Sequence, residues 1–343
     1  MMRKYPDTLT DIIADSGMNL NNISNLSGVS NTYLTKLSKN MINHPGKDKI
    51  ASILLALNQR ITDINAVLAE YDYQPLNKHD IPAILNNNRK RKIEGPLMPH
   101  YDRLYFELML VVLEQMGGAK IVVKDRPSGI YQPYRLYMLK EFQLELDGEA
   151  ERFLYELTGN VVRERLRLFE ENCRNGQTIT TYMCRECLNE ALDKIITQSI
   201  ADNDMGKLQY YAQYMANAAS CAIKFPEQHS LLITDRCSIF EFLIQDAYGK
   251  KPALNFTGNT RHTFNNPYDQ HNLEGFSTSA PALLKLFNTE VEMCKKAVTP
   301  ENSPARPEAF SNYVSEKFSR WKVGHIFEEA MDELMSTPDF KLF

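Results

Sequence analysis

The pattern of apolar and polar residues between positions 17 and 40 predicts two short helices joined by a tight corner. Apolar residues recur three positions apart within 23–26 and again within 34–37, which is the spacing of one buried helix face. The polar break at 28–30 separates the two helices. It contains Gly28, which can adopt the left-handed backbone conformation that so short a connection requires.

The residues around this corner divide into an inward and an outward set. Val29 is expected to fill the angle between the helices, and the hydroxyl of Ser30 is expected to cap the second helix. The outward set is polar, rich in hydrogen-bonding groups and net positive, as is typical of a helix that enters the major groove of DNA. It comprises Asn31, Thr32, Tyr33, Thr35 and Lys36.

Together with its neighbours, this stretch resembles the helix-turn-helix domain of the Xre/Cro (lambda-repressor-like) family of bacterial regulators. Apolar residues within 9–14 mark a preceding helix, and those within 50–57 and 64–68 mark two helices that follow. The resemblance covers residues 6–70. It implies an all-α domain of five helices that binds duplex DNA sequence-specifically, with residues 30–38 as the recognition helix.

The resemblance also indicates which residues would contact DNA. Leu20 stands where the family usually has a glutamine that binds a backbone phosphate, so either a neighbouring asparagine supplies that contact or binding is weak. Asn40 stands where the family often has glycine, and asparagine tolerates the same left-handed helix end. The candidate DNA-binding residues are Ser30, Asn31, Thr32, Tyr33, Thr35, Lys36, Lys39, Asn19 and Asn21.

A proline-containing polar stretch at 73–100 is predicted to be a linker that follows a helix-turn-helix domain at 1–72. Its basic run consists of Arg89, Lys90, Arg91 and Lys92. Such a run can lie along the DNA backbone or in a minor groove, and it can equally be a solvated part of the linker. Both interpretations stay open.

Residues 101–343 are predicted to form a mainly helical α+β domain with a small antiparallel sheet and a subdivision near residue 226. Apolar stripes predict helices at 101–117, 148–174, 184–200, 205–223 and 281–298, and a terminal helical pair. β-Branched and aromatic residues predict strands at 230–235, 237–245 and 251–258, and a hairpin from 119–125 to 130–138. This domain is expected to dimerise and to sense an unknown small molecule or protein.

The charge distribution supports a pairing of two chains. Residues 1–95 carry 12 Lys and Arg against 9 Asp and Glu, whereas the rest of the chain carries 27 against 34, which gives a net charge of −4. So small a positive excess cannot hold one copy on DNA by electrostatics alone at physiological salt. We therefore predict a homodimer that contacts two half-sites.

The six cysteines include one pair with the spacing of a zinc knuckle or a redox pair, Cys184 and Cys187. A tetrahedral metal site normally needs a fourth ligand and a second close pair, and no second pair follows nearby in the sequence. Free thiols are therefore favoured, and no metal or cofactor is predicted. A metal site and a redox switch stay open as alternatives.

The carboxyl-terminal part has polar residues but no recognised catalytic motif. Nucleophile-elbow, Walker, dinucleotide and HExxH patterns are missing from the sequence, so an enzyme is not predicted. The polar groups on which a catalytic interpretation would draw are Arg261, His262, His271, Asp235 and Glu241. Thr257, Arg261 and His262 have the composition of an anion-contacting loop and form a candidate ligand site.

These patterns together predict a cytoplasmic transcriptional regulator whose partner is double-stranded DNA. The sequence has no run of 18 apolar residues and no signal-peptide pattern, so no membrane association is expected. Two alternatives stay open. One is an enzyme whose helix-turn-helix only docks or autoregulates, and the other is a non-catalytic scaffold whose amino-terminal domain binds protein.

Overall fold

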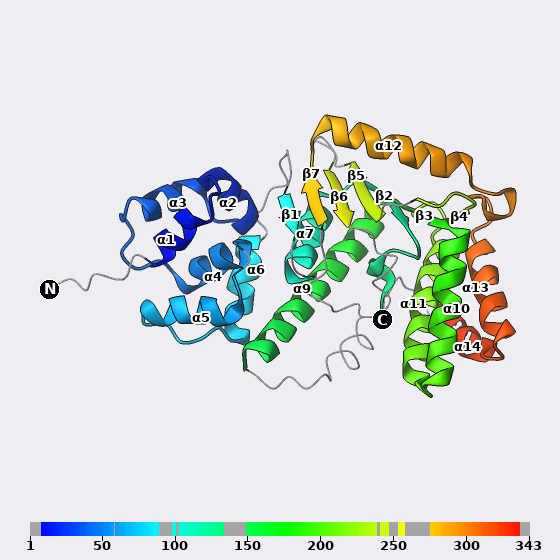
Figure 1. Ribbon diagram of the computed structural model, residues 1–343. Helices are drawn as coiled ribbons and strands as arrows, with labels where there is room; N and C mark the ends of the chain where they lie inside the picture. Colours follow the sequence, from blue (N-terminus) through cyan, green and yellow to red (C-terminus); the bar gives the residue numbers. More distant parts are fainter. Residues whose placement is uncertain are drawn as a thin grey trace. The chain divides into compact units, whose positions relative to one another are not determined.

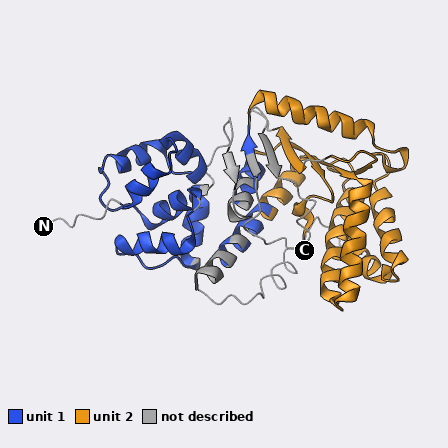
Figure 2. Ribbon diagram, in the orientation of Figure 1, with its two compact units in different colours: residues 1–115, 144–165, 270–278 blue, residues 116–143, 166–269, 279–343 orange. Residues whose placement is uncertain are grey.

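The computed structural model describes residues 8–57, 59–88, 98–100, 103–133, 149–238, 241–246, 253–257 and 275–336 of the 343-residue chain. The chain divides into two compact units (Figure 2). The first comprises residues 1–115, 144–165 and 270–278, and the second comprises residues 116–143, 166–269 and 279–343. The described part is mostly helical with a mixed sheet, so the predicted α+β class is confirmed at that level.

Short helices build the amino-terminal part of the first unit (Figure 1). They are α1 (Thr8–Asp15), α2 (Leu20–Ser27), α3 (Asn31–Ser38), α4 (Lys47–Ala56), α5 (Ile61–Glu70) and α6 (Ile81–Asn88), with a 3-10 turn, η1 (Lys78–Asp80), before α6. One apolar face of each of the first five helices is buried in a common core, as the three- and four-residue spacing requires. Its fully buried members include Leu9, Ile23, Leu34, Ile50 and Ile64.

Helix α6 belongs to this helical part, although its sequence lies within the stretch predicted to be a linker. Asn87 of α6 is fully buried and donates through Nδ2 to Oδ2 of Asp48 at 2.9 Å and to Oγ of Ser52 at 3.1 Å. Its Oδ1 accepts a hydrogen bond from Nζ of Lys49. The stretch from residue 78 to 88 is therefore packed against α4, and the prediction of a linker there is wrong.

The first unit also contains a two-stranded ladder and longer helices. The ladder pairs β1 (Met98–His100) antiparallel with β7 (Gly275–Thr278). Helix α7 (Arg103–Met116) follows β1, and α9 (Glu149–Arg174) passes from the first unit into the second. Both helices were predicted, whereas the two short strands were not.

Five strands of the second unit pair side by side in the order β6-β5-β2-β3-β4. They are β2 (Ala119–Lys124), β3 (Ile179–Cys184), β4 (His229–Thr234), β5 (Glu241–Asp246) and β6 (Ala253–Thr257). Strands β2, β3 and β4 run parallel to one another, whereas β5 runs antiparallel to both β2 and β6. The prediction of an antiparallel sheet is therefore wrong for its β2-β3-β4 half.

Helices cover both faces of this sheet (Figure 1). On one face, α10 (Arg185–Ala201), α11 (Met205–Lys224), α13 (Ala309–Arg320) and α14 (Gly324–Ser336) share a core with Val122, Met183 and Ile233 of the sheet. On the other face lies α12 (Pro281–Lys296). The ring of its Phe287 packs edge-on against that of Phe242 of β5, with the ring centroids 4.8 Å apart. Successive strand residues thus point alternately into two helical layers.

The predicted hairpin at 119–138 is not formed. Residues 119–124 form the central strand β2, which is followed by a bend and the 3-10 turn η2 (Gly129–Tyr131), and residues 134–138 lie outside the described part. The partner of β2 is instead the parallel strand β3, which is reached only after α9, because parallel neighbours need a long crossover connection. Among the described helices, none is long and apolar enough to cross a bilayer.

Candidate nucleic-acid interface and the carboxyl edge of the sheet

The corner between α2 and α3 has the geometry that its sequence predicts. Gly28 ends α2 with a φ of 70°, and its N–H donates to the carbonyl of Ser24 at 2.9 Å. Val29 is 2% exposed and lies in the angle of the corner. Ser30 begins α3, and its hydroxyl oxygen accepts the backbone N–H of Tyr33 at 3.3 Å. These contacts fix the direction in which α3 leaves the corner.

The polar face of α3 is exposed over most of its length. Asn31, Thr32 and Lys36 are exposed, whereas Leu34 and Leu37 are buried beneath them. The hydroxyl of Thr35, which is half-buried, lies 3.4 Å from Oδ1 of Asn31. A single helix face therefore carries an amide, two hydroxyls and an ammonium group, which are the donors and acceptors that read base edges.

Tyr33 is placed differently from the other candidates. It is half-buried, and burial raises the pKa of its phenol, which a hydrogen bond to the backbone of Gly46 partly offsets. Tyr33 therefore faces the start of α4 rather than solvent alone. Its position suits packing between α3 and the start of α4 better than a place in the middle of the exposed polar face.

The ends of α2 and α3 carry the remaining candidates from this unit. Asn19 caps α2, and its Oδ1 accepts the backbone N–H of Asn22 at 2.8 Å, so this side chain has a structural role. Asn21 is exposed on the first turn of α2. Lys39 is exposed where α3 ends, just before Asn40, which has the predicted left-handed conformation with a φ of 52°.

Some sequence candidates lie beyond the described residues. The basic run Arg89–Lys92 is one of these, and Arg261 and His262 of the candidate ligand loop, together with His271, are others. Thr257 ends β6, and the structure describes its backbone only.

A second group of polar residues lies where β2 ends. Since β3 and β4 lie on one side of β2 and β5 on the other, β2 is the point at which the strand order reverses. Open α/β sheets commonly bind ligands outside the carboxyl ends of their parallel strands, and β2, β3 and β4 all end at this edge. Asp125 directly follows β2, and Glu241 begins β5 beside it. Glu241 was a sequence candidate, but Asp125 was not.

Asp125 and Glu241 form a covered carboxyl pair between basic neighbours. Their side chains are 13% and 8% exposed. Nε of Arg126 lies 3.2 Å from Oδ1 of Asp125, and Nζ of Lys124 lies 3.2 Å from Oε2 of Glu241. Burial raises the pKa of Asp125 to about 7, opposed by the Arg126 charge and reinforced by the Glu241 carboxyl. Such a pair can hold one proton at neutral pH.

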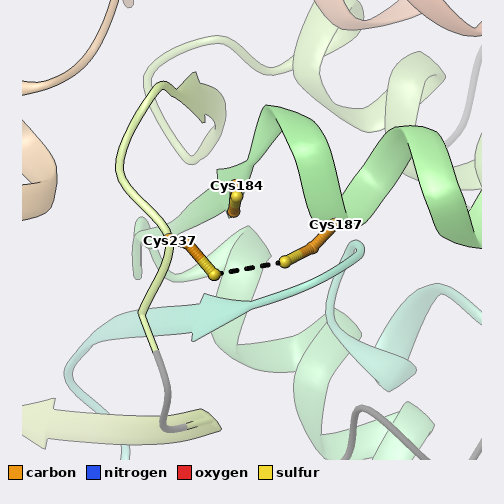
Figure 3. A group of neighbouring side chains, drawn as sticks. All are labelled: Cys184, Cys187 and Cys237. Carbon is orange, nitrogen blue, oxygen red and sulfur yellow. Dashed lines mark hydrogen bonds between the residues drawn. The ribbon is translucent and has the colours of Figure 1, made fainter.

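Three thiols meet at the same edge of the sheet (Figure 3). Cys184 ends β3, Cys187 lies in the first turn of α10, and Cys237 follows β4. Their sulfur atoms all lie within 4.8 Å of one another, and those of Cys187 and Cys237 are 3.4 Å apart. The sequence indicated the first two residues, but Cys237 lies 50 positions after Cys187. The sequence alone did not indicate Cys237, because its meeting with Cys187 depends on the parallel pairing of β3 with β4.

The chain was compared with protein-family models, curated proteins and solved structures. No family model matches it, and neither a curated protein nor a solved structure gives a significant match.

Proposed function

We propose that the protein is a transcriptional regulator that binds duplex DNA sequence-specifically by inserting α3 into the major groove. The observation that carries this proposal is the exposed row Asn31, Thr32 and Lys36 on a helix whose other face is buried. Arg and Lys side chains suit guanine acceptors, Asn suits adenine, and Thr suits either acceptor groups or the thymine methyl. The row therefore carries enough chemistry to distinguish base pairs.

The rigidity of α3 supports the same function. Ser30 caps its start, and at its end the N–H of Met41 donates to the carbonyl of Lys36 at 2.8 Å. A helix that is capped at both ends and packed by Leu34 and Leu37 presents its side chains in one arrangement before DNA arrives. Less conformational entropy is then lost on binding, which favours affinity.

The small positive charge of residues 1–95 leads to the second part of the proposal, which is a homodimer. Helix-turn-helix dimers place two recognition helices about 34–36 Å apart, on half-sites one helical turn apart. Two linked copies add their phosphate contacts and raise the effective concentration of the second module. The second unit would pair the chains, and an effector that changes this pairing would move the recognition helices out of register.

The test is a selection of duplexes from a random pool by the full-length chain, followed by titration of the selected duplex. Thr32→Ala and Lys36→Ala are each expected to weaken binding about tenfold, which corresponds to about 1.4 kcal/mol. Lys36→Ala should also lower the salt dependence if its ammonium contacts a phosphate. Matched controls are Thr289→Ala and Lys285→Ala, which remove the same groups from exposed positions of α12 and should leave binding unchanged.

Equal affinities of the wild type and both α3 variants would remove α3 from the interface. The scaffold alternative predicts no enrichment of any duplex in the selection. Dimerisation is tested separately by light scattering and by the footprint on the selected duplex. A symmetric footprint over two half-sites is expected, and a single protected half-site would contradict the dimer.

The enzyme alternative would draw on Asp125 and Glu241, whose perturbed environment is typical of catalytic carboxyls. Their side chains are covered, at 13% and 8% exposure, and a general acid or base must come within hydrogen-bonding distance of its substrate. The two carboxyls are also paired within the fold, with Lys124 and Arg126, so they have a structural role without catalysis. DNA binding is therefore the function that the exposed chemistry favours.

A further inference from the structure

The three thiols at the carboxyl edge of the sheet come from segments that are far apart in the chain. Cys184 and Cys187 belong to the junction of β3 with α10, and Cys237 belongs to the connection between β4 and β5. Figure 3 shows the sulfur atoms of Cys187 and Cys237 facing each other, with Cys184 nearby. Cysteines that are scattered along a sequence without a shared role have no reason to lie next to one another in the fold.

Two ion pairs hold the Cys237 segment in this place. Nε of Arg185 lies 2.7 Å from Oδ1 of Asp235, which ties the segment to the start of α10. Nη2 of Arg236 lies 2.9 Å from Oε2 of Glu290, which ties it to α12. The residues directly before Cys237 are thus anchored on both sides. The thiol of Cys237 lies 3.4 Å from that of Cys187, and both are free thiols.

The spacing of the sulfur atoms is close to that of a metal-thiolate site. With zinc–sulfur bonds of about 2.3 Å and tetrahedral angles, two sulfur ligands are about 3.8 Å apart. The three thiols, all within 4.8 Å, need only sub-ångström to ångström adjustments to reach this value. A disulfide would require a sulfur–sulfur distance of about 2.05 Å, and the sulfur atoms of Cys187 and Cys237 are 3.4 Å apart.

Two of the three thiols lie at the start of a helix. Cys184 directly precedes α10, and Cys187 lies in its first turn. Unpaired N–H groups at a helix start favour a negative charge, such as that of a thiolate that ligates a cation. A bound cation would displace the protons of these thiols.

We propose that Cys184, Cys187 and Cys237 bind one zinc ion. Three thiolates supply the soft ligands that zinc prefers, and the fourth position is open to water or to a further ligand. Each thiol that ligates the ion releases its proton to solvent, and no electron is transferred. Cys187 and Cys237 are partly exposed, which provides a route for the ion to enter. The bound ion would link the β3–α10 junction to the β4–β5 connection.

The test measures metal content in the full-length chain, purified under reducing conditions and then supplied with zinc. Wild type is expected to retain about one zinc ion per chain after gel filtration. Cys187→Ser and Cys237→Ser should each retain less than about a tenth of that amount, because hydroxyls are poor ligands for zinc. The matched control is Cys173→Ser, another half-buried thiol outside the cluster, which should bind zinc as the wild type does.

Two further readouts do not depend on how well the variants fold. Cobalt added to the metal-free wild type should give the intense absorption of a cobalt–thiolate site. Zinc should also protect Cys187 and Cys237, the two partly exposed thiols of the cluster, from a thiol reagent. A reduced wild type that takes up neither metal, or two cluster variants that keep full zinc content, would overturn the proposal. DNA binding is not a readout here, so this result is independent of the proposed function.

Discussion

Asp125 and Glu241 meet at the end of β2, where the backbone N–H of Asp125 donates a hydrogen bond to Oε1 of Glu241 at 3.3 Å. The two residues are 116 positions apart in the chain and come together because β5 runs antiparallel to β2. Behind them, the hydroxyl of Tyr214 donates to the carbonyl of Pro127, so α11 closes this end of the strand. The carboxyl pair thus joins the end of β2 to the start of β5, and the Tyr214 hydrogen bond joins α11 to the same end of β2.

Stability should depend on pH through Asp125. Its pKa is about 7 in the folded chain, because burial favours the neutral acid, and near 3.8 in the unfolded chain. The folded state therefore holds one more proton between these values, and this group's contribution to the free energy of unfolding falls as pH rises from about 4 to about 7. Asp125→Asn should remove this decline, on the order of 2 kcal/mol between pH 5 and 7.5.

The measurement is urea denaturation of wild type and Asp125→Asn at both pH values. The control is Asp246→Asn, which changes an exposed aspartate at the end of β5. Its difference between the two pH values should equal that of the wild type. If Asp125→Asn also keeps the wild-type difference, then the carboxyl pair does not titrate as described.

His229 predicts a pH dependence of the opposite sign. It is 1% exposed, with Nδ1 lying 2.9 Å from the hydroxyl of Tyr131, and burial together with the Lys120 charge lowers its pKa to about 3. The unfolded histidine gains a proton below pH 6.5, so this stabilisation is lost as pH falls from 6.5 towards 3. Between pH 7 and 5 the loss should be about 2 kcal/mol.

His229→Gln should lessen this acid sensitivity, although the variant also loses stability at pH 7 through its changed packing. The quantity to compare is therefore the pH 7 to pH 5 difference in the free energy of unfolding, not either value alone. His325→Gln, at an exposed position of α14, serves as the control and should behave as the wild type does. Equal differences in all three proteins would argue against a buried neutral imidazole.

Gly28 should tolerate asparagine better than alanine. Its φ of 70° lies in the left-handed region, where an alanine Cβ costs about 1–2 kcal/mol and where asparagine is found more often. Thermal unfolding should therefore rank the wild type first, Gly28→Asn second and Gly28→Ala third. The reverse order for the two variants would show that the space for a side chain at the corner, rather than the backbone conformation, determines their stability.

Asn87 should be needed for the packing of α6 on α4. Asn87→Ala leaves buried partners on α4 without their hydrogen bonds, at a cost of about 2–3 kcal/mol. Asn86→Ala, one residue earlier and exposed, should change the free energy of unfolding by less than about 0.5 kcal/mol. Comparable losses in both variants, measured by denaturant titration, would contradict the structural role of α6.

The sequence was most informative where the pattern is local. Helix spacing, the glycine corner and the cap at Ser30 depend on residues a few positions apart, and α2, α3 and α9 to α12 lie within a few residues of their predicted bounds. Asn87 was missed because its reason is tertiary. In the sequence Asn87 belongs to a polar run that is typical of a linker, and only its hydrogen bonds to α4 show its structural role.

The pairing of the strands was the feature that was hardest to predict from the sequence. The run at 119–124 has the alternation of a strand, but the sequence does not show whether its neighbour is the next strand or one beyond a long helix. The prediction of a hairpin chose the nearer partner and was wrong. The meetings of Asp125 with Glu241 and of Cys187 with Cys237 both follow from that strand order. Neither contact could be predicted from the sequence without the strand order.

The account depends most on the exposed face of α3. Its most direct test is competition binding by the full-length chain at low ionic strength, with the selected duplex labelled and a scrambled duplex of equal length and composition as competitor. The scrambled duplex should compete at least 100-fold less well than the unlabelled selected duplex, a difference of about 2.7 kcal/mol, and Thr32→Ala should narrow this gap. Equal competition by the two duplexes would contradict sequence-specific binding.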